Sequence, residues 1–389
     1  MVRRLLRGRS VMKKFVLKPK IYFNEGSMEF LKEIKGSCAF IVSDSVMETL
    51  GYLQKTIDYL NETGIESAVF KEVRPDPDVK VIAEGMKKYL ETQADTIVAL
   101  GGGSTIDAAK GIIYSLWQFR KAAGEEFKKP LFIAIPSTSG TGSEVTNFSV
   151  ITAEGEKVCI VDEWMAPDIA ILDSTCIQHV PQSVVADTGI DALVHAIEAY
   201  VSTEATHCTD ALAEKAVQLI FENLKALYND VSNSCARERI QNASCIAGMA
   251  FTNAGLGINH SLAHALGGTF HISHGRSNAL LLSAVVEYNA NLNSNDSRYA
   301  SEKYAKLAAV LQLPARTYRE GTINFMQAVK GLLKSLGIPN RVRELGIDKS
   351  KFENEVETMV ELALHDRCTP TNPRLPSRED LVGIYQKVF

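Results

Sequence analysis

Histidines are concentrated in one part of this sequence. The chain contains eight, and four of them fall within 15 residues: His260, His264, His271 and His274. They lie at the end of a stretch of 36 residues, 240–275, that contains no Asp, Glu, Lys or Arg. A segment without charges is typical of a protein interior, where an imidazole needs a hydrogen-bond partner or a metal ion. We therefore treat this region as a candidate metal site.

A carboxylate and a further histidine have a spacing that suits the same ion. Asp191 and His195 are four residues apart, which on a helix places both side chains on one face, about 6 Å from each other. His260 and His264 have the same spacing. The simpler alternative is that Asp191 and His195 form a surface ion pair, and that the buried histidines bond only to the backbone. Metal binding requires the two pairs to meet.

A turn must separate His260 from His274 if both are to bind one metal. The two residues are 14 positions apart, which is about 21 Å along a continuous helix. We expect Gly267 and Gly268 to break the helix, so that the chain turns back. Four side chains then converge: Asp191, His195, His260 and His274. Three imidazoles and one carboxylate suit a divalent transition metal that keeps room for a substrate oxygen.

Glycines follow an apolar run where a helix is expected to begin. The segment Gly101–Ser104 reads Gly-Gly-Gly-Ser and lies between the run Thr96–Leu100 and a helical pattern that starts at Thr105. Free N–H groups and the positive end of a helix bind phosphate in this geometry. The segment matches neither the GxGxxG nor the GxxxxGK[ST] pattern. The alternative is a tight turn in which Ser104 and Asp107 cap the helix.

A second loop, rich in hydroxyl groups, follows the next apolar run. Pro136–Glu144 contains five Ser or Thr residues and two glycines. Such groups at the carboxyl end of a strand bind phosphate or ribose oxygens, and two such loops favour a dinucleotide over a lone phosphate. Asp44, after the run Ala39–Ser43, is placed to bind an adenine-ribose diol and to repel a 2′-phosphate. The alternative is that Asp44 only caps the following helix.

The elements that carry these loops alternate in type over the first half of the chain. Short apolar runs typical of buried strands occur at five places: Ala39–Val42, Ala68–Phe70, Thr96–Leu100, Leu131–Ile135 and Ile169–Leu172. Helical periodicity fills the gaps, as in Val46–Leu60 and Val79–Leu90. This alternation predicts a parallel sheet with helices on both faces. We expect Phe148–Ile151 and Val158–Val161 to form a hairpin added to that sheet.

After Pro181 the pattern changes to helices alone, as in Ala211–Leu227 and Tyr304–Leu311. We therefore predict two domains. Residues 1–180 would form an α/β domain with a parallel, Rossmann-like dinucleotide-binding sheet, preceded by a basic extension over residues 1–17. Residues 181–389 would form an all-α metal-binding domain. In such pairs the ligand cleft usually lies between the domains, at the carboxyl ends of the strands.

The 389-residue chain has a net charge of −4 that averages two unlike parts. Residues 1–20 carry eight Lys or Arg and no acid, which leaves 34 basic against 46 acidic residues, or −12, for the rest. An acidic body gives no reason to expect nucleic acid as a partner. Seven scattered cysteines without a CxxC pair fit reduced thiols in a cytosol. No uncharged run is apolar enough to predict a membrane span.

The motifs together resemble the iron-dependent (group III) alcohol dehydrogenases, from about Lys18 to the C-terminus. The most similar members are bacterial enzymes that act on short-chain alcohols and aldehydes. The combination that carries the resemblance is Gly101–Ser104 with Asp107, the loop Pro136–Thr146, the helix Gly189–Glu198, His260 to His264, and His274 with Gly275. The segment Thr371–Arg374 also resembles family sequence.

The resemblance implies site residues one by one. The metal ligands would be Asp191, His195, His260 and His274, holding Fe²⁺, with Zn²⁺ as the alternative. His264 would lie beside the nicotinamide as the catalytic residue that relays a proton, a packing role being the alternative. Glu198 would either orient a ligand or be a charge on a helix face. The implied cofactor contacts are Asp44, Gly102, Gly103, Ser104, Asp107, Thr138, Thr141, Thr146 and Lys157.

The implied activity is the metal-dependent, NAD(H)-linked interconversion of a short-chain primary alcohol and its aldehyde, with the metal polarising the substrate oxygen during hydride transfer. Because Asp44 resembles the acidic residue of NAD-preferring members, we expect NAD(H) as the cofactor. One alternative is a glycerol-dehydrogenase-like polyol dehydrogenase of the same architecture. A second is a non-catalytic protein that binds NAD and a metal. We expect a cytoplasmic homodimer or higher homo-oligomer with a small-molecule substrate, no nucleic acid and no membrane span.

The basic extension precedes the resemblance, and we consider three explanations for it. The native chain begins at Met12; or the extension is a solvated tail; or it forms a weak amphipathic helix that docks on a partner such as the shell of a bacterial microcompartment. The apolar stripe of that helix would be Val2, Leu5, Leu6 and Met12. Gly8 weakens such a helix, so we rank docking last.

Overall fold

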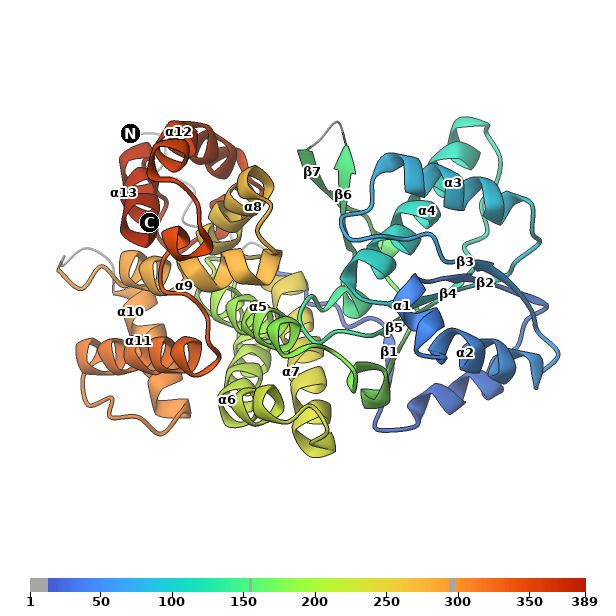
Figure 1. Cartoon of the computed structure of the whole chain (residues 1–389), viewed down its shortest axis with the longest axis horizontal. Helices are drawn as coiled ribbons and strands as arrows, with labels where there is room; N and C mark the ends of the chain where they lie inside the picture. Colours follow the sequence, from blue (N-terminus) through green and yellow to red (C-terminus); the bar gives the residue numbers. More distant parts are fainter. Residues whose placement is uncertain (1–12, 154–155, 294–297) are drawn as a thin grey trace.

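The computed structural model describes residues 13–153, 156–293 and 298–389. The predicted docking helix therefore lies outside the described residues. Figure 1 shows a sheet-containing part, drawn in blue to green, beside a part built of helices, drawn in light green to red. This arrangement confirms the predicted fold class, a parallel α/β sheet followed by an all-α region.

Six parallel strands form the main sheet, in the order β1-β8-β5-β4-β2-β3. Their bounds are β1 Lys20–Phe23, β2 Cys38–Val42, β3 Glu66–Phe70, β4 Thr96–Gly101, β5 Leu131–Pro136 and β8 Ile169–Leu172. Five of them cover the predicted apolar runs. The sequence pattern did not predict β1, because this strand has four residues, lies at the edge of the sheet and buries none of them.

Helices cover both faces of this sheet, as the alternating pattern predicted. Their bounds are α1 Ser45–Thr49, α2 Tyr52–Asn61, α3 Val79–Leu90 and α4 Gly103–Ala122. Successive side chains of a strand point to opposite faces. Ile41 and Val98 accordingly join a core with α1 and α2, whereas Phe40 and Ile97 join a second core with α3 and α4. The sheet is therefore buried on both sides, and its loops are left at the ends of the strands.

One predicted helix is two helices in the structure. The range Val46–Leu60 is divided between α1 and α2, and Gly51 lies between them with a φ of +81°. An L-residue adopts this left-handed conformation at a cost, whereas glycine does so freely. The prediction of a single helix was wrong because the apolar periodicity continues across the glycine. The prediction for α3, Val79–Leu90, matches the observed bounds.

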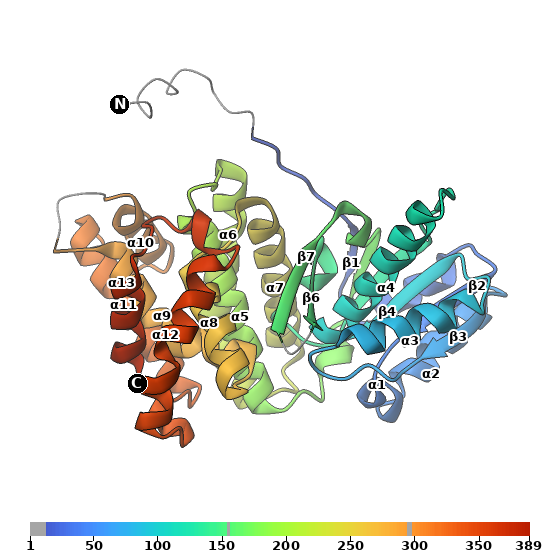
Figure 2. The same cartoon turned by 90° about the horizontal axis from the view of Figure 1, so that it is seen from above.

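The predicted hairpin forms, but it does not extend the main sheet. Strands β6 (Phe148–Ala153) and β7 (Glu156–Val161) pair antiparallel as a separate two-stranded sheet. They cannot pair with β5, because β4 and β8 already occupy both of its edges. The hairpin packs against α4, and β7 touches α8 (Ile258–Phe270) of the helical part. Figures 1 and 2 both show the hairpin standing between the two parts of the molecule.

The described residues after Pro181 contain no strand, as predicted. The helices there are α5 Gln182–Val201, α6 His207–Asn229, α7 Ser234–Ala254, α8 Ile258–Phe270, α9 His274–Ala290, α10 Tyr299–Val310, α11 Tyr318–Ser335, α12 Lys349–His365 and α13 Arg378–Val388. Short 3-10 helices of the whole described chain are η2 Ser27–Glu33, η3 Ser143–Val145, η4 Glu163–Met165, η5 Ser174–Ile177, η6 Val342–Leu345 and η7 Thr369–Thr371. Helix α5 is buried over most of its length and packs against α6, α7 and α9. It is therefore a rigid support for any side chain that it carries.

Candidate metal centre

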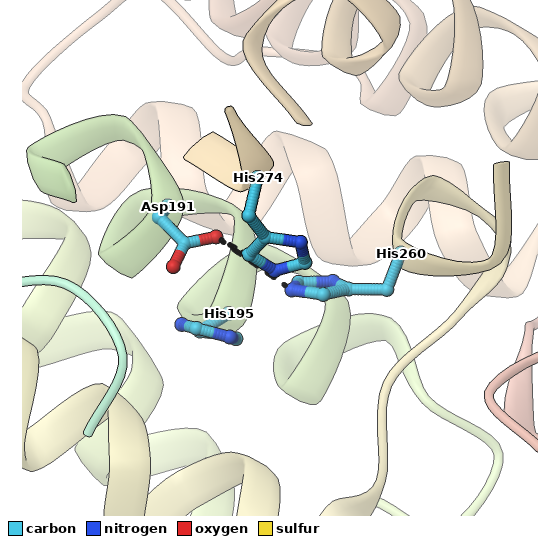
Figure 3. Close-up of side chains that lie close together, drawn as sticks. All are labelled: Asp191, His195, His260 and His274. Carbon is cyan, nitrogen blue, oxygen red and sulfur yellow. Dashed lines mark ion pairs between the residues drawn. The ribbon is translucent and has the colours of Figure 1, made fainter. Parts of the chain in front are cut away.

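Three helices bring the four predicted ligand residues together. Asp191 and His195 lie on α5, His260 on α8 and His274 at the start of α9. Each residue offers one potential ligand atom, and these four atoms all lie within 4.8 Å of one another. Nε2 of His274 is 3.4 Å, and Nε2 of His260 3.8 Å, from Oδ1 of Asp191. Figure 3 shows the four side chains pointing toward one another.

The turn that allows this convergence lies further along the chain than predicted. Helix α8 continues through Gly267 and Gly268, and it ends at His271, whose φ of +54° is left-handed. The expectation that the two glycines break the helix was wrong, because glycine in a helix interior costs only about 1 kcal/mol, which packing outweighs. At Gly267 a Cβ atom would lie 3.0 Å from the carbonyl oxygen of Ile272. This glycine therefore allows the chain to fold back closely onto α8.

Burial keeps the three imidazoles neutral. It lowers the pKa of His274 to about 4, and it holds the pKa of His260 well below its usual value. Burial likewise lowers the pKa of His195, although the charge of Asp191 opposes this shift. A neutral imidazole has a lone pair on one nitrogen, which a metal requires. The donor set of three neutral imidazoles and one carboxylate therefore fits a divalent transition metal such as iron or zinc.

Hydrogen bonds fix the orientation of two of these rings. Nδ1 of His260 lies 2.5 Å from Oε2 of Glu198, and Nδ1 of His195 lies 3.2 Å from the carbonyl oxygen of Gly140. A carbonyl oxygen only accepts, so Nδ1 of His195 donates and its Nε2 keeps the lone pair. The Glu198 carboxyl occupies Nδ1 of His260, so Nε2 is the nitrogen of that ring that faces the other candidate ligands. Burial raises the pKa of Glu198 to about 8, and backbone N–H groups that include that of Asn259 oppose this rise. The structure thus places Glu198 against a candidate ligand, one of the two roles considered for it.

The sequence did not predict Asn278, which touches three of the four candidate ligands. Its Nδ2 donates to Oδ1 of Asp191 at 2.8 Å and lies within 3.3 Å of Nε2 of both His260 and His274. Asn259 donates to its Oδ1 at 2.8 Å and so fixes the direction of the amide. The signal in the sequence is its position one helical turn after His274. An uncharged amide at that spacing is too common to identify a site.

His264 lies at the edge of this cluster and has a partner of its own. Its ring stacks on that of His274, with centroids 5.3 Å apart. Its Nδ1 lies 2.7 Å from Oδ2 of Asp366, a residue that the sequence did not single out. His271, excluded from the predicted ligand set, is exposed at the end of α8.

The two predicted cofactor loops face each other across the ends of β4 and β5. Gly102 is the N-cap of α4, and Gly103 is its first residue. A Cβ atom on Gly102 would lie 3.3 Å from Thr138, and one on Gly103 would lie 2.6 Å from Thr141. Both threonines are partly exposed. The start of α4 has no side-chain cap, and Thr141 Oγ1 accepts from the N–H of Ser143 at 3.2 Å. The uncapped helix start beside these two hydroxyl groups suits a phosphate.

Two predicted cofactor residues instead point into the protein. Asp107 accepts hydrogen bonds from Ser143 Oγ at 2.6 Å and from the N–H of Val150 at 3.0 Å. Thr146 is buried and accepts a hydrogen bond from Lys110 at 2.9 Å. The capping pair considered for Ser104 and Asp107 does not form, because the carboxylate is turned toward Ser143. These side chains hold the two loops together.

The remaining three predicted cofactor residues have protein partners at the surface. Asp44 caps α1 by accepting from the N–H groups of residues 46 and 47, and its other oxygen accepts from Thr105 Oγ1 at 2.9 Å. Ser104 Oγ accepts weakly from the N–H of Asp76 at 3.3 Å. Lys157, on β7, forms an ion pair with Asp76 at 2.8 Å. Both alternatives considered for Asp44 therefore remain compatible with its position beside the glycine loop.

Known protein families match the sheet-containing part and the helical part of the chain separately. Residues 18–174 match the family described as iron-containing alcohol dehydrogenase, and residues 185–389 match the C-terminal part of the Fe-containing alcohol dehydrogenase family. Among solved structures, the iron-containing alcohol dehydrogenase of Thermococcus thioreducens has a TM-score of 0.87 and 34% sequence identity, over 96% of this chain and 99% of its own.

Proteins of similar sequence are named as dehydrogenases that act on alcohols. The NADPH-dependent butanol dehydrogenase of Clostridium saccharobutylicum is 39% identical over 97% of this chain and 98% of its own, and the 1-propanol dehydrogenase of Citrobacter freundii is 38% identical over 97% and 100%. An aldehyde-alcohol dehydrogenase of Streptococcus pneumoniae is 39% identical over 100% of this chain and 47% of its own. The chain thus spans about half the length of that relative. No helix in the described ranges is long and apolar enough to cross a membrane.

Proposed function

The chain belongs to the iron-containing alcohol dehydrogenase family, and from this premise we propose that it interconverts a short-chain primary alcohol and its aldehyde with NAD(H). The observation that carries the proposal is the convergence of Asp191, His195, His260 and His274 from three helices. Relatives named as butanol and 1-propanol dehydrogenases support a short aliphatic substrate. The activity is that of an alcohol oxidoreductase.

The proposed metal ligands are Asp191, His195, His260 and His274, since all four are buried or partly buried and the imidazoles are held neutral. A divalent metal bound there would polarise the oxygen of the substrate, and the nicotinamide would exchange a hydride with its carbon. The chain itself orients the donors: Glu198 holds the ring of His260, and the carbonyl of Gly140 holds that of His195.

We propose that the dinucleotide lies over the glycine loop, with its phosphates at the start of α4. The start of α4 at Gly102 and Gly103, which no side chain caps, and the nearby hydroxyls of Thr138 and Thr141 support this placement. A carboxylate at Asp44 supports NAD(H) over NADP(H), because it would repel a 2′-phosphate. One relative carries the name NADPH-dependent, so the preference is a property to be measured on this chain.

The metal assignment is tested with two variants and a matched control. Purified His260→Ala and Asp191→Asn should each lose bound iron or zinc, measured by elemental analysis, and lose NAD-dependent oxidation of 1-propanol or 1-butanol. Both should still bind NADH, measured by fluorescence. His271→Asn replaces an exposed histidine of the same region, at a left-handed position that asparagine tolerates, and should retain metal and activity. Wild-type metal content in His260→Ala would exclude this ligand set.

We further propose that residues 1–180 and 181–389 are the two domains, and that the protein is a cytoplasmic homo-oligomer. The change from sheet to helices between β8 and α5 supports the boundary. Seven cysteines, all of them free, support a reducing compartment. Sedimentation of the purified protein measures its oligomeric state, and a monomer would contradict the proposal. Docking on a microcompartment shell is the least favoured proposal, and deletion of residues 1–11 with loss of shell binding would be its test.

A further inference from the structure

We propose that Asp366 is the positioning residue of His264: its carboxylate keeps a proton on Nδ1 and thereby leaves Nε2 free to accept one. The proposal deepens the proposed function, since it rests on that function for the source of the proton. The geometry is direct, because Nδ1 of His264 lies 2.7 Å from Oδ2 of Asp366. The two residues are 102 positions apart in the sequence, so the contact is made by the fold.

The fold holds Asp366 in place from several sides. The residue is the C-cap of α12, and its Oδ1 accepts a hydrogen bond from the N–H of Cys368 at 2.8 Å. Ser261 donates to the same oxygen at 3.4 Å. The next residue, Arg367, donates to the carbonyl oxygen of Cys159 on β7 at 3.1 Å. Since one oxygen is fixed by a backbone N–H, the other is aimed at His264.

The charge of Asp366 decides which nitrogen of His264 carries the proton. Burial opposes ionisation, but the hydrogen bond with His264 outweighs it and lowers the pKa of Asp366 to about 2; its other oxygen already accepts from the N–H of Cys368. An ionised carboxylate can only accept hydrogen bonds, so Nδ1 must be the donor. Among the described residues, Nε2 of His264 has no hydrogen-bond partner. It is therefore an acceptor beside His274, with whose ring His264 stacks.

A second metal site is the competing interpretation, because His264, Asp366 and Cys368 also place potential ligand atoms within 4.8 Å of one another. A thiol must lose its proton to bind a metal well. Burial raises the pKa of the free Cys368 thiol well above its usual value, and Nδ1 of His264 and Oδ2 of Asp366 already lie at a hydrogen-bond distance of 2.7 Å from each other. The structure therefore favours a histidine–carboxylate pair, in which the carboxylate fixes the tautomer and stabilises the imidazolium that forms when Nε2 takes a proton.

The tautomer is measured by NMR on zinc-loaded protein labelled with ¹⁵N-histidine. The signals of His264 are assigned as those lost in His264→Gln. In the wild type we expect Nδ1 protonated and Nε2 unprotonated. In Asp366→Asn the side-chain amide can either donate or accept a hydrogen bond, so the tautomer with Nε2 protonated should become populated. Asp366→Glu should restore the wild-type pattern. A wild-type protein with Nε2 protonated would overturn the proposal without any variant, as would an unchanged pattern in Asp366→Asn.

Kinetics give the second readout. Asp366→Asn should lower kcat for alcohol oxidation by about 10- to 100-fold, part of what a positioned proton acceptor contributes, while KM for NAD and the metal content remain unchanged. Asp348→Asn is the matched control, because Asp348 caps the other end of the same helix and asparagine caps equally well. A wild type that oxidises no alcohol would refute the proposed function alone, since the tautomer is measured without turnover. Wild-type kcat in Asp366→Asn would overturn the positioning role.

Discussion

At the scale of single residues, Asp44 combines two tasks that the sequence could not separate. One oxygen caps α1, and the other accepts from Thr105 at the edge of the glycine loop. Gly101 is required beside it, because a Cβ there would lie 2.7 Å from the Asp44 carboxylate. The negative charge of Asp44 therefore lies close enough to the glycine loop to attract or repel a group that binds there.

Asp44→Gly should therefore raise the use of NADPH. Removing the negative charge lifts the repulsion of a 2′-phosphate, whereas glycine costs a helix N-cap only a few tenths of a kcal/mol. The ratio of kcat/KM for NADPH to that for NADH should rise about 10-fold or more, which corresponds to about 1.4 kcal/mol. Asp348→Gly removes an N-cap far from the glycine loop and should leave the ratio unchanged. An unchanged ratio in Asp44→Gly would restrict Asp44 to capping.

Buried charges beside the second loop give a pH-dependent stability. Glu144 is buried near Lys110, and burial raises the pKa of the Glu144 carboxyl from 4.5 to about 7. Burial also lowers the pKa of the Lys110 ammonium to about 8, although it donates to Ser143, Thr146 and the carbonyl of Phe148. A buried carboxyl with a raised pKa is neutral in the folded state at a pH where the unfolded chain is already ionised.

Glu144→Gln should consequently gain stability over the wild type as the pH rises. Below about pH 4.5 the Glu144 carboxyl is protonated in both the folded and the unfolded wild type, so it does not lower the free energy of unfolding. Between about pH 4.5 and 7 the unfolded state ionises first, so the free energy of unfolding of the wild type falls by up to about 3 kcal/mol. Above about pH 7 this decrease stays constant. The Tm difference between variant and wild type should follow this curve in thermal scans from pH 4 to 8. A difference that does not change with pH would contradict it.

The grouping of candidate side chains was predictable from the sequence where spacing along one element carried the information. Asp191 and His195 share a helix face, so their proximity was readable before the fold was known. Asn278 and Asp366 were missed for the opposite reason. Asp366 contacts His264 across 102 residues, and no local pattern distinguishes it from a helix-end aspartate. Side chains that act through tertiary contacts are therefore the part of a site that one sequence does not reveal.

At the scale of elements, the buried strands were predictable because both of their faces are covered, which makes them continuous apolar runs. The pairing of the hairpin was not predictable, since it depends on which sheet edges remain open. The end of α8 was misplaced because the fold-back occurs at His271, in a left-handed conformation, and not at Gly267 or Gly268. Element types thus follow from periodicity, whereas their ends and neighbours follow from packing.

The junction of β4 and α4 should be intolerant of a side chain. In Gly103→Ala the new Cβ would lie 2.6 Å from Thr141 Cγ2, and a β-branched threonine has little rotamer freedom to move away. The second loop must shift, which we expect to weaken NADH binding about 10-fold, within the 1–3 kcal/mol typical of overpacking. Gly331→Ala, in α11 with open space around the site of the Cβ, is the control and should bind NADH normally. Equal affinity in both variants would show that the two loops do not cooperate.

At the scale of the whole molecule, hydrogen bonds and side-chain packing join the sheet-containing part to the helices. Gly140 meets His195, and Arg367 meets Cys159 on the hairpin. Asn253 of α7 accepts from the N–H of Val16 at 2.8 Å and donates to its carbonyl oxygen at 3.0 Å. Leu172 of β8 also packs in one apolar cluster with Cys245 of α7. The candidate metal residues themselves all belong to α5, α8 and α9, so a metal bound there would stabilise the helical part directly and the dinucleotide loops through the contacts between the two parts.

Metal removal should therefore lower the stability of the protein without abolishing dinucleotide binding. A metal that binds only the folded state stabilises it by about 2.7 kcal/mol when its free concentration is 100 times the Kd. We expect chelated protein to unfold at a lower Tm than metal-loaded protein, to regain the higher Tm when iron or zinc is restored, and to bind NADH in both states. His260→Ala should show one Tm with or without metal, whereas His271→Asn should respond like the wild type. A Tm shift of equal size in His260→Ala would place the stabilising ion elsewhere. Loss of NADH binding on chelation would show that the contacts between the two parts couple the dinucleotide loops tightly to the metal residues.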